Sequence, residues 1–166
     1  LAKARAGGMR VLGPNAQGIA NFGQGIIASF SSLFLETPPE DGPVAIISQS
    51  GSMAAVPYGQ LRERGIGVRY SIATGNQIDL TVGDFAKAVL GDPDIRLVLL
   101  YMESIPDAGP LAEAAALARE REAAVVAVKA GWSARGTAAA RSHTGALASE
   151  DRVVQAFCEH HGIWRA

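Results

Sequence analysis

A single histidine stands in a long stretch of small and polar residues near the end of the chain. His143 is flanked by Ser142, Thr144 and Gly145, and no regular apolar spacing runs through residues 131–147. The sequence predicts a loop here, and a loop longer than about 12–15 residues in a compact domain usually has a function or lacks fixed structure. Histidine can act as a nucleophile that forms a covalent intermediate. His143 is therefore a candidate nucleophile, with a solvated surface histidine as the alternative.

The segment "ISQSGS" at residues 47–52 has the pattern of a strand, a tight glycine turn and a helix start. Ser50, Gly51 and Ser52 would present free backbone N–H groups at the positive end of the helix dipole, which suits a phosphate. Gly51 would let the backbone come close to the anion. The alternative is an ordinary serine cap followed by a glycine needed for packing. The spacing excludes a Walker A loop.

Two further polar groups follow apolar runs. The segment "TGNQID" at residues 74–79 offers Asn76 and Asp79, and its alternative reading is a turn followed by a helix capped by Asp79. Glu103 ends the very apolar run at residues 95–103. A carboxylate in such a place is costly unless it is exposed or paired. Glu103 could accept a hydrogen bond from one ring nitrogen of a histidine and so orient it.

The elements that must position these residues alternate between strands and helices. The predicted strands are residues 43–48, 67–74, 95–103 and 123–131, and the predicted helices are residues 52–65, 79–93, 107–122 and 149–162. This alternation is typical of an α/β domain with a mostly parallel sheet covered on both faces. The first forty residues instead predict an irregular or hairpin lead-in. Because ligands bind at the carboxyl ends of such strands, the polar groups should share one rim.

Composition narrows the class of protein. The chain has 166 residues, which suits one domain, and a formal net charge of −1, which disfavours nucleic acid or an anionic membrane as a partner. The lone Cys158 can form no internal disulfide, has no companion for zinc, and is expected to be a buried apolar group. No metal-binding motif, apolar run of about 18 residues or secretory signal is present, so we expect no metal and a cytoplasmic location.

Read together, the motifs resemble the ligase (flavodoxin-like) domain of ADP-forming acyl-CoA synthetases, related to the α subunit of succinyl-CoA synthetase. The motifs run in order along nearly the whole chain: "GPNAQG" at 13–18, "ISQSGS" at 47–52, "TGNQIDL" at 74–80, "LYMES" at 100–104, and "KAGWSARGTAAARSHTGALASEDRVVQAFCEHHGI" at 129–163. The resemblance implies a three-layer flavodoxin-like (Rossmann-type) α/β domain over residues 1–166. The chain ends suggest a fragment of a longer polypeptide.

The resemblance also implies a mechanism. Acid, CoA and ATP are converted reversibly to acyl-CoA, ADP and phosphate through a phosphorylated histidine on a mobile loop. Carried onto this sequence, His143 is the phosphorylated residue and Glu103 is its carboxylate partner. Ser50, Gly51 and Ser52 head the helix that holds the phosphate. Other residues expected near the site are Asn15, Asn76 and Gly145.

The same resemblance sets expectations for cofactors and partners. The domain itself would bind only phosphate, while CoA and ATP/ADP with Mg would be bound by CoA-binding and ATP-grasp domains of the same protein or a partner subunit. The isolated fragment would be inactive, the parent protein an oligomer, and the substrate a small carboxylic acid or its acyl-CoA. Two alternatives stay open: a non-catalytic acyl-CoA- or ligand-sensing module of a protein acetyltransferase, and a domain binding another phosphate ligand.

Overall fold

A computed structural model of the chain describes residues 1–130 and 151–166, which form a seven-stranded sheet in the order β2-β1-β4-β3-β5-β6-β7. The strands are β1 (Gly18–Asn21), β2 (Ile26–Ser29), β3 (Val44–Ser48), β4 (Val68–Ala73), β5 (Leu97–Met102), β6 (Ala124–Lys129) and β7 (Trp164–Arg165). The helices are α1 (Ala2–Ala6), α2 (Leu33–Glu36), α3 (Gly51–Glu63), α4 (Val82–Leu90), α5 (Gly109–Glu120) and α7 (Asp151–His161). A 3-10 turn, η1 (Phe22–Gln24), joins β1 to β2.

The sheet is mostly parallel, as the alternation of strands and helices predicts. β4, β3, β5, β6 and β7 run parallel, while β1 pairs antiparallel with both β2 and β4. The predicted hairpin lead-in is therefore confirmed, and it extends the sheet at one edge. Parallel strands end on the same side of a sheet, so β3, β4 and β5 bring their carboxyl ends together.

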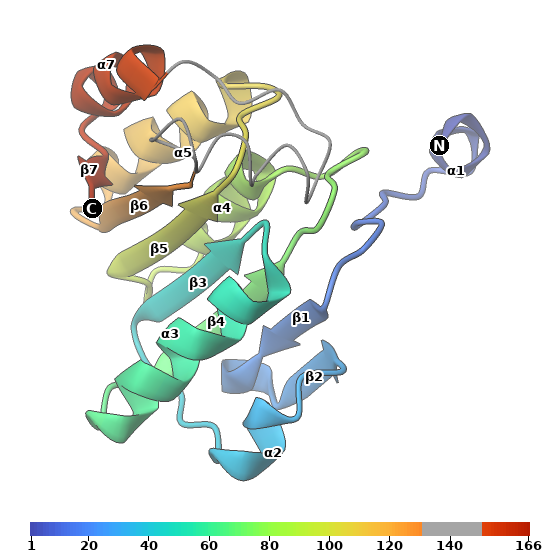
Figure 1. Cartoon of the computed structure of the whole chain (residues 1–166), viewed down its shortest axis with the longest axis vertical. Coiled ribbons are helices and arrows are strands. Elements are labelled where there is room, and N and C mark those ends of the chain that lie inside the picture. The colour runs from blue at the N-terminus through green and yellow to red at the C-terminus, as the bar shows by residue number, and fades with distance from the viewer. Residues whose placement is uncertain (131–150) are drawn as a thin grey trace.

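Helices cover both faces and make three layers (Figure 1). α3 and α2 lie on one face, while α4 and α5 lie on the other. The larger apolar core joins the sheet to α4, α5 and α7, and it includes the buried Cys158. The smaller core joins β1, β3 and β4 to α2 and α3 around Phe22, Phe34 and Tyr58, whose ring centroids lie 4.9–5.2 Å apart. β3, buried at every residue, is held between the two cores.

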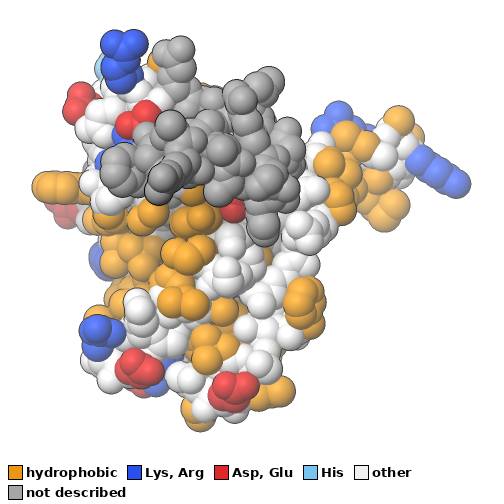
Figure 2. All heavy atoms as spheres, in the orientation of Figure 1, with side chains coloured by type: hydrophobic (Ala, Val, Ile, Leu, Met, Phe, Trp, Pro, Cys, Tyr) orange, Lys and Arg blue, Asp and Glu red, His pale blue; other side chains and the backbone are white. Residues whose placement is uncertain are grey.

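The α3 face is not evenly covered by the described helices. Figure 2 shows hydrophobic side chains gathered beside α3, in the region that Figure 1 places over β5 and β6. A shallow hollow of about 110 Å³ lies there, and its lining includes Met53, Leu99, Val126 and Val128. Among the described residues, no helix is both long enough and apolar enough to span a bilayer.

α4 begins later than the sequence predicts. Its N-cap is Thr81, whose hydroxyl accepts a hydrogen bond from the Asp84 N–H at 3.2 Å, while an Asp84 carboxylate oxygen accepts from the Thr81 N–H at 2.8 Å. This reciprocal arrangement is a capping box. The prediction that Asp79 caps α4 is therefore wrong. Thr81 is the cap, because a threonine followed three residues later by an aspartate satisfies two N–H groups at the helix start.

α4 and α5 approach each other closely at a glycine. A Cβ atom built on Gly83 would stand 2.5 Å from the Leu111 nitrogen and 2.9 Å from the Pro110 carbonyl carbon. These are backbone atoms at the start of α5, so they cannot move aside as a side chain could. Gly83 therefore sets the distance between the two helices that cover one face of the sheet.

Gly83→Ala should lower the free energy of unfolding by about 1–3 kcal/mol, because the added methyl group forces α4 and α5 apart. Gly59→Ala is the matched control on α3, since its Cβ would meet only the Leu33 side chain, at 3.4 Å. That control should be neutral or stabilising by up to about 1 kcal/mol, because alanine favours helix over glycine. Urea denaturation of the three proteins measures both effects, and equal stabilities would contradict this account.

Candidate functional site

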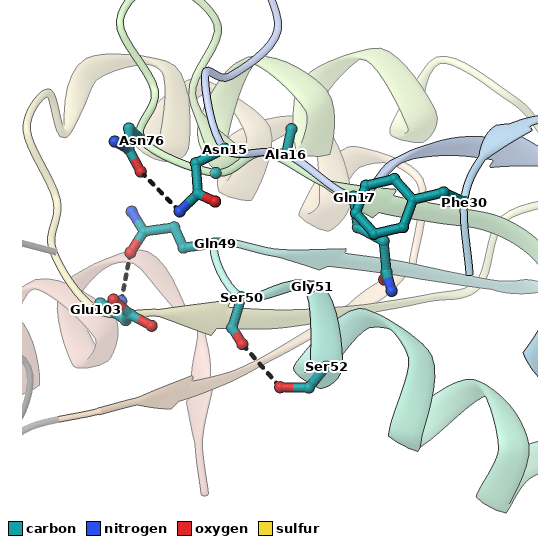
Figure 3. A pocket seen from close by; sticks show the side chains of 11 residues that line it. Asn15, Ala16, Gln17, Phe30, Gln49, Ser50, Gly51, Ser52, Asn76 and Glu103 are labelled. Carbon is teal, nitrogen blue, oxygen red and sulfur yellow. Dashed lines mark hydrogen bonds between the residues drawn. The ribbon is translucent and has the colours of Figure 1, made fainter. Parts of the chain in front are cut away.

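A cavity of about 470 Å³ opens at the carboxyl ends of β3, β4 and β5 (Figure 3). The lining residues come from five segments of the chain: Asn15, Ala16, Gln17, Phe30, Gln49, Ser50, Gly51, Ser52, Gly75, Asn76 and Glu103. All predicted site residues in the described part of the chain are in this group. His143 and Gly145, with the predicted loop that carries them, lie outside the described residues.

The turn between β3 and α3 is fixed by a short internal hydrogen-bond pattern. The Ser48 hydroxyl accepts from the Ser50 N–H at 3.0 Å and donates to the Ser50 carbonyl at 2.6 Å. Ser50 is the N-cap of α3 with extended backbone angles, and its side chain makes no capping bond. Its hydroxyl lies 3.1 Å from that of Ser52, as Figure 3 shows. The Ser50 side chain is thus left at the cavity rather than folded onto the helix.

The start of α3 has the chemistry of an anion site. The first N–H groups of an α-helix have no partner within the helix, and they carry the positive end of its dipole. Gly51 and Ser52 supply two of these groups at the cavity wall. A Cβ on Gly51 would come within 3.0 Å of the Gln17 side chain, which packs against the turn. Glycine therefore keeps this wall compact.

Glu103 faces the same cavity from the end of β5. The residue is only 8% exposed, and its Oε2 atom is buried without a hydrogen-bond partner among the described residues. A buried carboxylate oxygen normally accepts at least one hydrogen bond, because leaving it unpaired is costly. The arrangement therefore offers a free acceptor to a donor entering the cavity.

Gln49 was missed by the sequence analysis, and its side chain makes three hydrogen bonds to the chain that follows β5. Its side-chain oxygen accepts from the Glu103 N–H and, at 2.9 Å, from the Ser104 N–H. Its side-chain nitrogen donates to the Ser104 carbonyl at 2.7 Å. The motif "SQSGS" contains an amide side chain directly after an apolar strand, but the sequence does not indicate which group this amide binds. Only the strand order reveals that β5 lies beside it.

The segment before β1 forms the opposite wall. The Asn76 N–H donates to the Pro14 carbonyl at 2.9 Å, and the Asn15 side chain reaches toward that of Asn76 at 3.5 Å. Gly75 has a positive φ of 61°, and a Cβ there would stand 2.3 Å from the Pro14 carbonyl oxygen. The "GPN" and "TGN" motifs are therefore in direct backbone contact. This contact places both asparagines at the cavity.

Asp79 anchors this wall instead of capping α4. It accepts hydrogen bonds from Arg5 Nη2 at 3.1 Å, from Arg10 Nε at 2.9 Å and from the Val11 N–H at 2.8 Å. Its side chain is 3% exposed. The hydrogen bond from Arg10, followed by that from Val11, holds the pKa of the Asp79 carboxyl well below its usual range. The charge of Asp79 therefore ties the first residues of the chain to the loop after β4.

A second group of charges lies at the ends of β6 and β7. Lys129 is buried, and its ammonium group donates to the Ala130 carbonyl at 2.5 Å. Burial lowers the pKa of Lys129. Asp151, the first residue of α7, is paired with Arg165, and their hydrogen bond lowers the pKa of the aspartate. Lys129 and Asp151 stand on either side of residues 131–150 in the sequence. The described residues contain no cluster of His, Cys, Asp and Glu that could hold a metal ion.

Comparisons with known proteins agree on one family. The model of the "Succinyl-CoA ligase like flavodoxin domain" matches residues 41–166. The α subunit of ADP-forming acetate–CoA ligase I from Pyrococcus furiosus is 36% identical over 98% of this chain, which spans 34% of that subunit. The ADP-forming acetate–CoA ligase of Methanocaldococcus jannaschii is 35% identical over 95% of this chain, which spans 22% of that protein.

A solved structure has the same fold. The dinucleotide-forming acetyl-coenzyme A synthetase 1 of Ca. Korarchaeum cryptofilum, in complex with phosphate and ADP, superposes with a TM-score of 0.86 at 31% identity. The match covers 99% of this chain and 35% of that one. The flavodoxin-like α/β fold is thereby confirmed. The chain spans only about a third or less of the length of these relatives.

Asp79→Asn should destabilise the protein most at neutral pH. The pKa of Asp79 is lower in the folded state than its usual value of about 3.9. The charged carboxylate therefore stabilises the fold fully above about pH 3.9, and this stabilisation is lost as the pH falls toward the folded-state pKa. The difference in melting temperature between the wild type and Asp79→Asn should therefore shrink from about pH 7 to about pH 3. Glu120→Gln, an exposed carboxylate near the end of α5, is the control and should show no such trend. A difference independent of pH would contradict this assignment.

Proposed function

We propose a function for this chain from its family, because the chain belongs to the succinyl-CoA-ligase-like flavodoxin domains. Residues 1–166 are the phosphohistidine-carrying domain of an NDP-forming acyl-CoA synthetase. The parent enzyme converts an acid, CoA and ATP reversibly to acyl-CoA, ADP and phosphate. One observation carries the proposal. The start of α3 and the buried carboxylate of Glu103, whose Oε2 has no hydrogen-bond partner among the described residues, line the same cavity.

The phosphate is held at the start of α3. The N–H groups of Gly51 and Ser52 donate to its oxygens, and the Ser50 hydroxyl lies beside them at the cavity wall. Asn15 and Asn76 supply amide groups from the facing wall. Neutral hydrogen-bond donors on two sides, together with the positive end of the α3 dipole, suit a bound anion. The placement of these donors on two facing walls supports phosphate as the anion bound at the site.

His143 is the group that carries the phosphoryl unit. One imidazole nitrogen uses its lone pair to form the N–P bond as the O–P bond of an acyl phosphate breaks, and the electron pair of that bond leaves with the carboxylate oxygen. The other ring nitrogen keeps its proton, and its N–H donates a hydrogen bond to the Glu103 carboxylate, which stabilises the positive charge of the ring. The free Oε2 of Glu103 suits this role. Gly145, two residues after His143 in the sequence, belongs to the same proposed site.

The remaining steps belong to other domains. CoA is bound by a CoA-binding domain and ATP or ADP, with Mg, by an ATP-grasp domain, in the same polypeptide or a partner subunit of an oligomeric enzyme. The greater length of the relatives and the ADP and phosphate in the solved relative support this division. The isolated chain therefore binds phosphate but does not complete a turnover. The acid is a small carboxylic acid.

The natural polypeptide that carries this chain, with its nucleotide-binding partner, should become labelled when incubated with γ-labelled ATP and magnesium. The label should be acid-labile and base-stable, as expected for a phosphohistidine. His143→Ala should abolish it, because the nucleophile is gone. His160→Ala is the matched control, since this exposed histidine at the end of α7 has no role in the proposal and should leave labelling unchanged. A folded wild type that takes up no label would overturn the catalytic assignment and favour a sensing module.

A further inference from the structure

We infer that Gln49 is a positioning residue that holds Glu103 in place for phosphoryl transfer. This inference rests on the proposed function and adds to it a residue that is neither one of the proposed phosphate-binding groups nor the proposed nucleophile. Gln49 lies at the first position after β3, between Ser48 and the cap residue Ser50. It is 9% exposed, and its side chain reaches across to the chain that follows β5 (Figure 3).

The pairing of β3 with β5 stops just before the site. The last paired residues are Ser48 and Tyr101, and the Gln49 N–H adds one more ladder bond, to the Tyr101 carbonyl at 3.0 Å. In a continued parallel ladder, the main-chain carbonyl of Gln49 would next accept from the Glu103 N–H. Here the chain turns into α3 instead. The Glu103 N–H therefore loses its main-chain partner on β3.

The Gln49 side chain takes over the role of the missing strand. Its oxygen accepts from the N–H groups of both Glu103 and Ser104, and its nitrogen donates to the Ser104 carbonyl at 2.7 Å. A primary amide carries the same acceptor and donor types as a peptide group, so it can extend a backbone ladder. Glutamate would lack the donor, and lysine or arginine would lack the acceptor. Glutamine alone among the long side chains meets both requirements.

This clamp fixes the backbone of a residue whose carboxylate is buried. Oε2 of Glu103 is buried, and no described side chain holds that atom by a hydrogen bond. Its placement follows from the backbone at Glu103, and Gln49 determines that backbone on the β3 side. A displacement of about 1 Å in a positioned group can slow a reaction by about 100-fold. Gln49 therefore acts on the reaction through Glu103.

The test uses the natural polypeptide and its nucleotide-binding partner, with saturating γ-labelled ATP and magnesium in single-turnover mixing. Gln49→Met keeps the length of the side chain and removes its three hydrogen bonds. It should slow phosphorylation about 10- to 100-fold while the final amount of label stays that of the wild type. Gln60→Met, at an exposed position on α3, is the matched control and should leave the rate unchanged. If Gln49→Met does not fold, Gln49→Asn, which shortens the amide, replaces it.

A double-mutant cycle with Glu103→Gln separates positioning from a merely structural role. If Gln49 acts through Glu103, the Gln49 variant should slow the Glu103→Gln protein by less than about threefold, because contacting residues that share one function are not additive. If the two effects multiply in full, or if Gln49→Met reacts as fast as the wild type, the inference is overturned and the proposed function stands. Absence of label in the wild type overturns both.

Discussion

The end of the parallel ladder between β3, β4 and β5 is the constraint on which the site depends. Peptide groups beyond the last paired residue are still half-buried and must find partners, because an unpaired buried peptide group is costly. The chain meets this need locally: Ser48 binds the backbone of Ser50, and Gln49 binds that of Glu103 and Ser104. The Pro14 carbonyl serves Asn76 in the same way. The cavity lies between the segments that these hydrogen bonds hold in place.

The two apolar cores hold the strands whose carboxyl ends form the cavity. β3 lies between them, and the helices on each face are fixed by close contacts such as those of Gly83 with the start of α5. The aromatic cluster of Phe22, Phe34 and Tyr58 holds the added hairpin against α3. Apolar burial thus excludes polar groups from the interior and concentrates them at the strand ends. A phosphate site built there rests on a preorganised frame.

Much of this architecture could be predicted from the sequence, for identifiable reasons. The sequences of β3 and β5 are short and continuously apolar, and glycines and prolines separate them from helices, so their order follows from local pattern. Asp79 was misassigned because an aspartate before a helix looks like a cap, whereas its partners Arg5 and Arg10 are distant in sequence. Gln49 was missed for the same reason. The roles of His143 and Gly145 remain proposals from family resemblance.

Titration of the isotope-labelled chain with inorganic phosphate, followed by NMR, tests the central claim most directly. The account predicts that the backbone amide resonances of Gly51 and Ser52 and the side-chain amide of Asn76 shift together and saturate with one dissociation constant. These three groups converge on the cavity from two walls, so joint saturation would locate the anion between them. Saturable shifts confined to other residues, or no saturable shift at these three groups, would contradict a phosphate site at the end of the parallel ladder.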